Sequence, residues 1–344
     1  MNKTKRSQLS RLIFAILFTS TLLFLLERYT ALFVIYAPLQ QSLPSSTSFL
    51  TVSSIIPTRR IALFFLTRQI QVPLLLFLQS IASCDIYDIY VVVDDYTDAS
   101  DIDVYHDLGY HDNDSIIIIQ YRDDELKELG YSGMNYGGGM PSAWDKAWYA
   151  NTVDPRYAYK YDYVYWIEDD VFIPSIHTLV NLTQSVQNAH TPPDLIISEY
   201  LSDQSDPEWS WWDVYRATSL WPILKLYDAT YKSTLCAFGM SRKYLHALHK
   251  FHTTVAKVTN IVNEFSIPSI AAYYGLVVYI PQQFNNTIIF RNTATLDEQW
   301  HMNDIAHTND SVMHLYHPVK DQVTQNKYRA ELFRQYNINN KCPN

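Results

Sequence analysis

The chain has 344 residues, of which 48% are hydrophobic; this content excludes an intrinsically disordered protein and allows one large domain or two modest ones. Lys and Arg number 26 against 35 Asp and Glu. Four of the basic residues lie within the first eleven positions, so the rest of the chain carries 22 basic against 35 acidic residues and would repel a polyanion. Nucleic acid is therefore not expected as a partner.

The first expected element is a membrane-directed segment. Residues 12–26 read LIFAILFTSTLLFLL, follow a basic start, and are continued by apolar residues up to about residue 37. The stretch is short for a bilayer span, which needs about 20 residues, and long for a signal-peptide core of roughly 7–15. Because no cleavage site of small residues follows Leu26, we expect an uncleaved signal anchor over 12–37, a cytosolic tail over 1–11 and a lumenal body. A cleaved signal peptide is the alternative.

Glycosylation sequons and the number of cysteines agree with a lumenal body. Four Asn-x-Ser/Thr sequons follow the anchor, at Asn113, Asn181, Asn285 and Asn309. The three cysteines are Cys84, Cys236 and Cys342. They allow one disulfide with one thiol left over, and they lack the CxxC spacing of metal or redox sites. Cys84 or Cys236 as an ordinary buried residue is the alternative.

The body is expected to be an α/β domain with a mostly parallel sheet. Residues 38–58 are rich in Ser, Thr and Pro and predict a short stem. The apolar run IALFFL over 61–66 is typical of a strand buried on both faces. Further strands are expected at 86–95, 115–121 and 163–168, with helices at 72–83 and 141–152. Strands that alternate with helices predict a mostly parallel sheet, here in a catalytic domain over 59–320 followed by a tail over 321–344.

Polar residues stand at the carboxyl ends of three of these expected strands. They are Thr67 and Arg68, Asp94 and Asp95, and the triplet Glu168, Asp169 and Asp170. Ligands bind at the carboxyl ends of parallel strands. Unpaired carboxylates after a buried strand would cost several kcal/mol each by rough desolvation estimates, so a cation is expected to meet them. Asp oxygens suit Mg²⁺ or Mn²⁺, which commonly bring phosphates with them. The alternative is that the triplet opens a loop or caps a helix.

With these motifs the chain resembles the GT-A glycosyltransferases, nucleotide-sugar enzymes of the secretory pathway that have a cytosolic tail, signal anchor, stem and lumenal catalytic domain. The stretch FFLTR resembles their nucleotide-binding loop, VVVDD their base or ribose site, and WIEDDVFI their acidic DxD-type motif in the Glu-Asp-Asp form of some N-acetylglucosaminyltransferases. The resemblance covers about residues 60–320 and implies a Rossmann-like sheet with flanking helices.

The resemblance implies a role for each residue of these motifs. Arg68 would contact the base or a phosphate, and Asp94 and Asp95 the base or ribose. Asp170 would be the direct metal ligand. Asp169 would be a second ligand or a ribose contact, and Glu168 would meet a sugar hydroxyl.

Two stretches between and after these motifs are candidates for ligand contacts. The segment 130–139 holds five of the eight glycines and predicts an active-site loop, with a plain turn as the alternative. Lys146, next to Asp145, could touch sugar or phosphate, or form a surface ion pair. Trp211 and Trp212 belong to a tryptophan-rich stretch that could stack on an acceptor sugar or build ordinary core.

The later part of the chain supplies three more candidates. Glu264, expected in a loop before an amphipathic helix, is the only acid between Asp228 and Asp297 and is the expected general base; a helix-capping acid is the alternative. The resemblance also implies that His314 or His317 returns to the metal and that Lys320 meets the diphosphate, although a surface histidine is the default interpretation. An imidazole ligand suits Mn²⁺ better than Mg²⁺.

Together these features predict a single-pass type II glycosyltransferase of the Golgi or endoplasmic reticulum. It would move a hexosyl or N-acetylhexosaminyl group from a nucleotide-diphosphate sugar, a UDP-sugar, to a glycan or glycoprotein acceptor, with Mn²⁺ or Mg²⁺. A glycoside hydrolase with paired carboxylates is one alternative. A membrane-anchored glycan-binding protein with a degenerate transferase fold is another.

Overall fold

The structure is a computed structural model, and it describes residues 60–94, 115–132, 139–255, 263–281, 288–290, 314–336 and 342. All of them belong to one unit of the chain, residues 57–344. The expected anchor and stem, Asp95 and the sequons at Asn113, Asn285 and Asn309 lie outside the described residues. Within the described ranges, no helix combines the length and the apolar character that crossing a bilayer requires.

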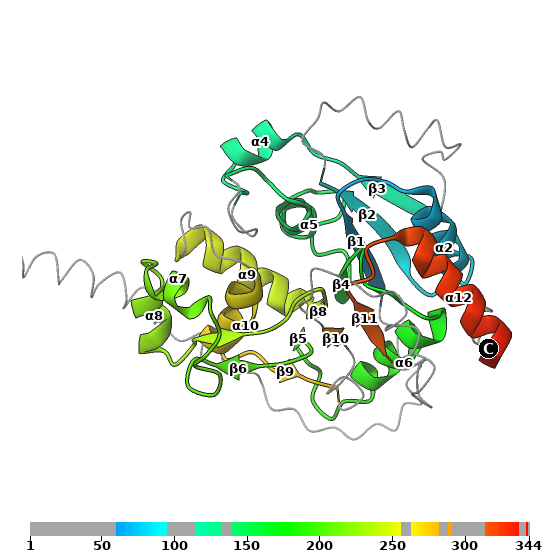
Figure 1. The fold of residues 1–344 in the computed structure, drawn as a ribbon. Coiled ribbons are helices and arrows are strands. Elements are labelled where there is room, and N and C mark those ends of the chain that lie inside the picture. The colour runs from blue at the N-terminus through cyan, green and yellow to red at the C-terminus, as the bar shows by residue number, and fades with distance from the viewer. Residues whose placement is uncertain are drawn as a thin grey trace, which may run out of the picture. The chain divides into compact units, whose positions relative to one another are not determined.

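A seven-stranded, mostly parallel sheet forms the centre of the fold, in the order β3-β2-β1-β4-β8-β5-β9 (Figure 1). Its strands are β1 (Ile61–Thr67), β2 (Asp88–Val93), β3 (Ile116–Ile119), β4 (Tyr163–Glu168), β5 (Leu195–Ile196), β8 (Ala237–Ser241) and β9 (Val278–Tyr279). Only β8 runs antiparallel to its neighbours in this sheet. The prediction of an α/β domain with a mostly parallel sheet is confirmed.

Helices cover both faces of the sheet because β1 and β2 bury side chains on both. Alternate residues of these strands enter two separate core clusters, one with α5 (Ala143–Thr152), α9 (Arg242–Thr254) and α10 (Asn263–Tyr273), the other with α2 (Val72–Ala82) and α6 (Ile176–Gln187). Gly239 of β8 allows a close approach, since a Cβ there would lie 2.7 Å from the ring of Tyr165. The predicted strands and helices up to β4 are therefore confirmed, with bounds that differ by at most about two residues at each end.

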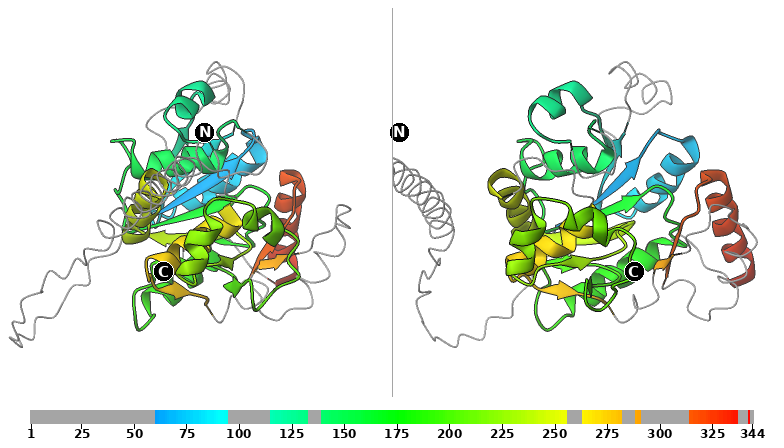
Figure 2. Two further views of the ribbon diagram at one scale, coloured as in Figure 1. Left: turned by 90° about the vertical axis from the view of Figure 1, so that its left-hand side faces the viewer. Right: turned by 60° about the vertical axis from the view of Figure 1, so that its left-hand side comes forward.

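Smaller elements complete the fold. They are α4 (Asp123–Glu128), β6 (Leu201–Ser202), α7 (Trp212–Arg216), α8 (Trp221–Leu226), β7 (Tyr231–Lys232), β10 (Ile288–Phe290), β11 (Leu315–His317) and α12 (Gln322–Tyr336). β6 pairs antiparallel with β7, and β10 pairs parallel with β11. Figure 2 shows α12, in red, and the helices α9 and α10, in yellow, on either side of the sheet.

The C-terminal helix α12 packs on α2 and belongs to the same unit as the sheet, although the sequence suggested a tail from residue 321. Arg329 is buried between the rings of Phe77 and Phe172, and its Nε donates to the carbonyl of Ile173 at 2.9 Å. Burial lowers the pKa of the guanidinium to about 9, and the two rings partly compensate by cation–π attraction.

A disulfide joins Cys84, just after α2, to Cys342, at a sequence separation of 258 residues and a Cα–Cα distance of 5.2 Å. Cys236 is the free cysteine and is buried. The bond closes a loop that contains nearly the whole domain, so the chain-entropy account of disulfides predicts a large effect on the unfolded state.

We expect the double variant Cys84→Ser/Cys342→Ser to lose about 3–5 kcal/mol of the free energy of unfolding, since the long loop is then free in the unfolded chain. Urea unfolding followed by circular dichroism measures this loss. Wild-type protein unfolded under reducing conditions is the control and should match the double variant. Equal stability of the oxidised wild type and the double variant would contradict the prediction.

Candidate active site at the carboxyl ends of the strands

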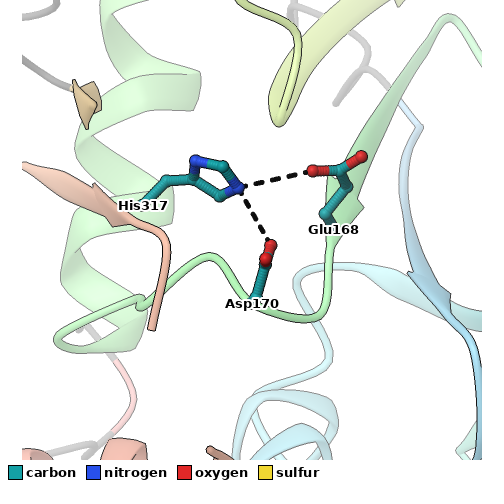
Figure 3. Close-up of side chains that lie close together, drawn as sticks. All are labelled: Glu168, Asp170 and His317. Atoms are coloured by element: carbon teal, nitrogen blue, oxygen red, sulfur yellow. Dashed lines mark ion pairs between the residues drawn. The ribbon is translucent and has the colours of Figure 1, made fainter. Parts of the chain in front are cut away.

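Glu168, Asp170 and His317 form a three-residue group whose potential ligand atoms all lie within 4.8 Å of one another (Figure 3). Nε2 of His317 lies 3.1 Å from Oδ1 of Asp170 and 3.5 Å from Oε2 of Glu168. Glu168 is the last residue of β4, Asp170 follows in the next turn, and His317 ends β11. The structure thus brings together two candidates from the acidic triplet and one from the later part of the chain.

Backbone pairing holds the acidic turn and β11 side by side. Phe172 and Tyr316 form an antiparallel bridge, with N–H to carbonyl distances of 2.8 and 3.1 Å, and Val319 N–H donates to the Asp170 carbonyl at 2.7 Å. The two aromatic side chains are fully buried together in a small cluster with residues of α12. Because this pairing is fixed by the backbone, His317 faces the carboxylates without help from a ligand.

Side chains of α12 bind the same turn from the other side. The amide of Gln325 donates to the carbonyls of Asp169 and Val319, each at 2.9 Å, and the amide of Gln322 also donates to the Asp169 carbonyl. Both glutamines are buried. These bonds satisfy backbone oxygens that a tight acidic turn would otherwise leave unpaired.

Two carboxylates and one imidazole form a donor set that suits a divalent metal ion. Three protein ligands leave other coordination positions open for water or a phosphate, and the mixture of oxygen and nitrogen suits Mn²⁺ better than Mg²⁺. Without a metal, burial disfavours the imidazolium, but Cys236 and the carboxylates of Asp170 and Glu168 outweigh this and raise the pKa of His317. The imidazole of His317 therefore holds a proton at the position where a metal ion is expected, and binding of a metal ion there would release this proton.

His314 does not belong to this group. It lies three residues before His317, and side chains alternate along an extended strand, so the two residues are directed to opposite faces. The ring of His314 instead contacts Tyr316 edge-on, with centroids 6.4 Å apart.

The side chain of Asp169 turns away from the group and toward β1. Its Oδ2 lies 2.6 Å from the hydroxyl of Thr67, which also lies 2.7 Å from the carbonyl of Gln69. Burial raises the pKa of Asp169 to about 6, with smaller contributions from Asp170 and Glu168. The single hydroxyl hydrogen of Thr67 cannot be donated to both the Gln69 carbonyl and Asp169. A protonated Asp169 would therefore complete this series of hydrogen bonds by donating to the Thr67 oxygen.

A second charged cluster surrounds the start of α5. Lys146 is fully buried and its Nζ lies 2.7 Å from Oδ1 of Asp123, so the surface ion pair considered from the sequence is wrong. Asp145 is also buried, where it caps the helix through Ser142. Asp94, directly after β2, joins this cluster: burial raises its pKa to about 6, Lys146 lowers it, and the other two carboxylates raise it. Two of the residues expected to contact the donor, Asp94 and Lys146, therefore lie in one cluster, although Lys146 is covered by its neighbours.

Glu264 lies in the first turn of α10 rather than in a loop before it, and α10 is buried along most of its length instead of amphipathic. The carbonyl of Glu264 accepts from the N–H of Ser233 at 2.9 Å. Burial raises the pKa of Glu264, and the nearby carboxylate of Glu168 adds to the rise. The candidate base therefore lies within electrostatic reach of the acidic turn.

The remaining candidates differ in exposure. Arg68 and Lys320 are exposed, at the end of β1 and three residues after His317. Trp211 is partly buried, whereas Trp212 is 1% exposed and its Nε1 donates to the carbonyl of Asp206 at 2.7 Å. Trp212 is thus a core residue, and an acceptor could not reach its face. In the glycine-rich segment, Gly130 and Gly139 adopt positive φ, and 133–138 lie outside the described residues.

Several residues at this site carried no signal in the sequence. Asp123 looks like an ordinary helix-start acid, Gln322 and Gln325 look like surface positions of a terminal helix, and Cys236 gives no hint that it meets His317. Each acquires its role from a contact with a residue far away in the chain. Only the spacing of Gln322 and Gln325, which places both on one face of a helix, could have suggested a shared partner.

Comparisons with known proteins give only remote likenesses. No protein-family model and no curated protein sequence matches the chain. Glucosyl-3-phosphoglycerate synthase from Mycobacterium tuberculosis, in complex with Mn²⁺, UDP and glucosyl-3-phosphoglycerate, is 13% identical with a TM-score of 0.26, over 57% of this chain and 66% of that one. The same enzyme with Mg²⁺ and UDP is 14% identical with a TM-score of 0.27, over 55% and 58%.

Mouse xyloside xylosyltransferase 1, in its apo form, is 10% identical with a TM-score of 0.34, over 75% of this chain and 96% of that one. The chain spans less than two thirds of the length of the two synthase structures, 66% of one and 58% of the other. At these TM-scores the likeness supports no conclusion about activity, so the proposals below rest on the residues of this chain.

The raised pKa of Asp94 makes a prediction about stability. A carboxyl whose pKa is higher in the folded than in the unfolded protein favours folding when protonated, and this stabilisation is lost as the pH rises from about 4 through about 6. Asp94→Asn should therefore raise the melting temperature at pH 8, with roughly 2–4 °C for each kcal/mol gained, and the difference from wild type should shrink toward pH 4.

Thermal unfolding at pH 4, 6 and 8 measures the effect. Asp213→Asn, which changes a carboxylate that is 89% exposed, is the control and should show no such pH trend. A lower melting temperature of Asp94→Asn at pH 8 would mean that attraction to Lys146 dominates over burial.

Proposed function

We propose that the chain is a glycosyltransferase that moves a sugar from a nucleotide-diphosphate donor, a UDP-sugar, to a glycan or glycoprotein acceptor. The observation that carries this proposal is the group of Glu168, Asp170 and His317 at the carboxyl end of the central strand β4. Parallel strands direct ligands to this edge of the sheet. Asp94 lies at the end of the nearby strand β2, so a metal-bound diphosphate and a nucleoside could lie along the same edge.

Glu168, Asp170 and His317 would hold Mn²⁺, which neutralises the charge that develops on the departing diphosphate. Asp169 would stay bound to Thr67 and support the turn rather than coordinate the ion, because its carboxylate is directed to β1. Arg68 follows β1, and Lys320 lies three residues after His317. Both are exposed and are proposed to meet the base and the phosphates.

The donor nucleoside is proposed to contact Asp94, together with Asp95 outside the described residues. Lys146 is assigned a positioning role, since it is fully buried and paired with Asp123. In this position it draws the Asp94 carboxylate toward the start of α5, where the backbone N–H of Ala143 also binds it. The transferred group is proposed to be a hexosyl or N-acetylhexosaminyl unit.

Glu264 is proposed as the general base that takes the proton of the acceptor hydroxyl. A base works best when its pKa is close to the working pH, and burial raises the pKa of Glu264 in that direction. The charges of Glu168 and His317 also shift the pKa of Glu264, which supports a position of its carboxyl group near the candidate metal ligands.

We further propose that residues 12–37 anchor the protein in the membrane of the Golgi or endoplasmic reticulum, with the catalytic domain in the lumen. The basic residues before the segment and the four sequons after it support this topology. Single-pass type II insertion would then place the catalytic domain in the compartment where it is proposed to use nucleotide sugars.

Asp170→Asn should abolish Mn²⁺-dependent UDP binding and nucleotide release while leaving the fold intact, because it removes a charged ligand without changing side-chain volume. Calorimetric titration of UDP with Mn²⁺, and a screen of nucleotide sugars for nucleotide release by purified full-length protein, measure the two effects. Asp124→Asn on the exposed side of α4 is the control. Full activity of Asp170→Asn, or of the wild type after exhaustive chelation, would rule out the metal site. Glycan cleavage without any nucleotide would favour a hydrolase.

Glu264→Gln should keep UDP binding and folding but lower turnover by roughly 10²–10⁴-fold, which is the usual contribution of a general base. Initial rates at saturating donor measure the loss, and nuclear magnetic resonance of the product gives the anomeric configuration, which should be inverted. A loss below tenfold, or a retained configuration, would leave Glu264 as an acid of the helix start.

A further inference from the structure

We propose that a second cluster, made of Glu199, Asp206 and Lys232 beside Trp209, is the subsite for a neutral sugar ring of the acceptor. The inference rests on the proposed function, since it names the acceptor class of the same active site. Trp209 belongs to the tryptophan-rich stretch that the sequence offered for acceptor binding, whereas Glu199, Asp206 and Lys232 were not singled out as candidates. They come from the loop after β5, the loop after β6 and the strand β7.

The cluster is built by tight and specific contacts. Nζ of Lys232 lies 2.9 Å from Oδ2 of Asp206 and 3.4 Å from Oε1 of Glu199, and it lies 5.4 Å from the ring centroid of Trp209. Oε1 of Glu199 also accepts from the N–H and the hydroxyl of Thr234, at 3.1 and 2.9 Å. The side chains are therefore held in place before any ligand arrives, which reduces the entropy that binding must overcome.

The same contacts leave hydrogen-bonding groups available. All the contacts described for Glu199 use Oε1, and the ion pair of Asp206 uses Oδ2, so each carboxylate keeps a second oxygen. These side chains are 30% and 32% exposed, so a ligand can reach them. Lys232 has three N–H donors and uses two in its ion pairs. Trp209 packs on Tyr215 and Trp212 and so forms a fixed wall of the cluster. Two acceptors and one donor beside it match the neighbouring hydroxyls of a sugar ring.

The cluster lies at a suitable place relative to the metal group. Thr234, which binds Glu199, is two residues from Cys236, whose carbonyl accepts from the N–H of Glu168 at 2.8 Å. Two residues span at most about 7 Å. Glu264 lies next to the cluster in the fold, since its carbonyl accepts from the N–H of Ser233 at 2.9 Å and Ser233 follows Lys232 in the chain. An acceptor sugar on the cluster would thus reach the candidate base.

The charge of the cluster selects among acceptors. Glu199, Asp206 and Glu264 bring three carboxylates, and Lys232 brings one ammonium group that is already paired. These carboxylates would repel a phosphorylated, sulfated or uronic-acid acceptor. The paired ammonium group of Lys232 would not offset the free-energy cost of removing water from the anionic group of such an acceptor. A neutral pyranose, whose hydroxyls donate to the carboxylates, avoids this penalty.

Saturation-transfer nuclear magnetic resonance with purified full-length protein tests the proposal. The probes are the methyl glycosides of mannose, galactose and glucose, and methyl glucuronide as the anionic analogue of the last. At least one neutral glycoside should bind, and methyl glucuronide should bind more weakly than methyl glucoside. Glu199→Gln and Asp206→Asn, which keep side-chain size, should each weaken binding of the neutral glycoside by roughly tenfold.

Asp213→Asn is the matched control, because it removes a carboxylate of the same region that pairs only with Arg216 on its own helix, and it should bind glycosides like the wild type. Titration of UDP with Mn²⁺ on the same samples separates the two proposals. If wild type binds UDP with Mn²⁺ but no neutral glycoside, or if both cluster variants bind the glycoside normally, the subsite is refuted and the proposed function stands. If UDP does not bind, the proposed function fails whatever the glycosides do.

Discussion

The candidate site depends on one backbone contact between distant parts of the chain, the antiparallel bridge of Phe172 and Tyr316. This bridge holds the turn after β4 against β11, so that His317 meets Glu168 and Asp170. Its two aromatic side chains are fully buried, which makes sliding of β11 along the turn costly. A shift of one residue would reverse the face on which His317 lies. The geometry of the group is therefore set by packing rather than by attraction between charges.

Packing of this kind is needed because the carboxylates of this region repel one another. Burial raises the pKa values of Asp169 and Glu264; the carboxylates of Asp170 and Glu168 add to the rise at Asp169, and that of Glu168 adds to the rise at Glu264. Like-charged groups at one edge of a sheet favour dispersal or protonation. A fold that holds them together is predisposed to accept a divalent cation, which reverses the sign of the local field and converts repulsion into attraction.

The supports of this region lie outside the strands that carry it. Gln322 and Gln325 of α12 bind the backbone of the acidic turn, and Arg329 binds the carbonyl of Ile173. The Cys84–Cys342 disulfide joins the residue after α2 to the C-terminal segment. The C-terminal segment is therefore a structural part of the site. Segment 232–236 has an equivalent role for the cluster around Lys232, because it connects Lys232 with the contact between Cys236 and Glu168.

Strands β1 to β4, the helices α2 and α5, and the polar residues at the ends of β1, β2 and β4 could be predicted from the sequence, because continuous apolar runs and polar strand ends are local signals. The sequence also singled out His317 and His314 together, and Glu264. Only the tertiary structure decided between the histidines, directed Asp169 to Thr67, buried Lys146 against Asp123 and revealed Lys232 with Glu199. These outcomes depend on which surfaces meet after the chain has folded, and contacts between residues far apart in the chain leave no periodic pattern in the sequence.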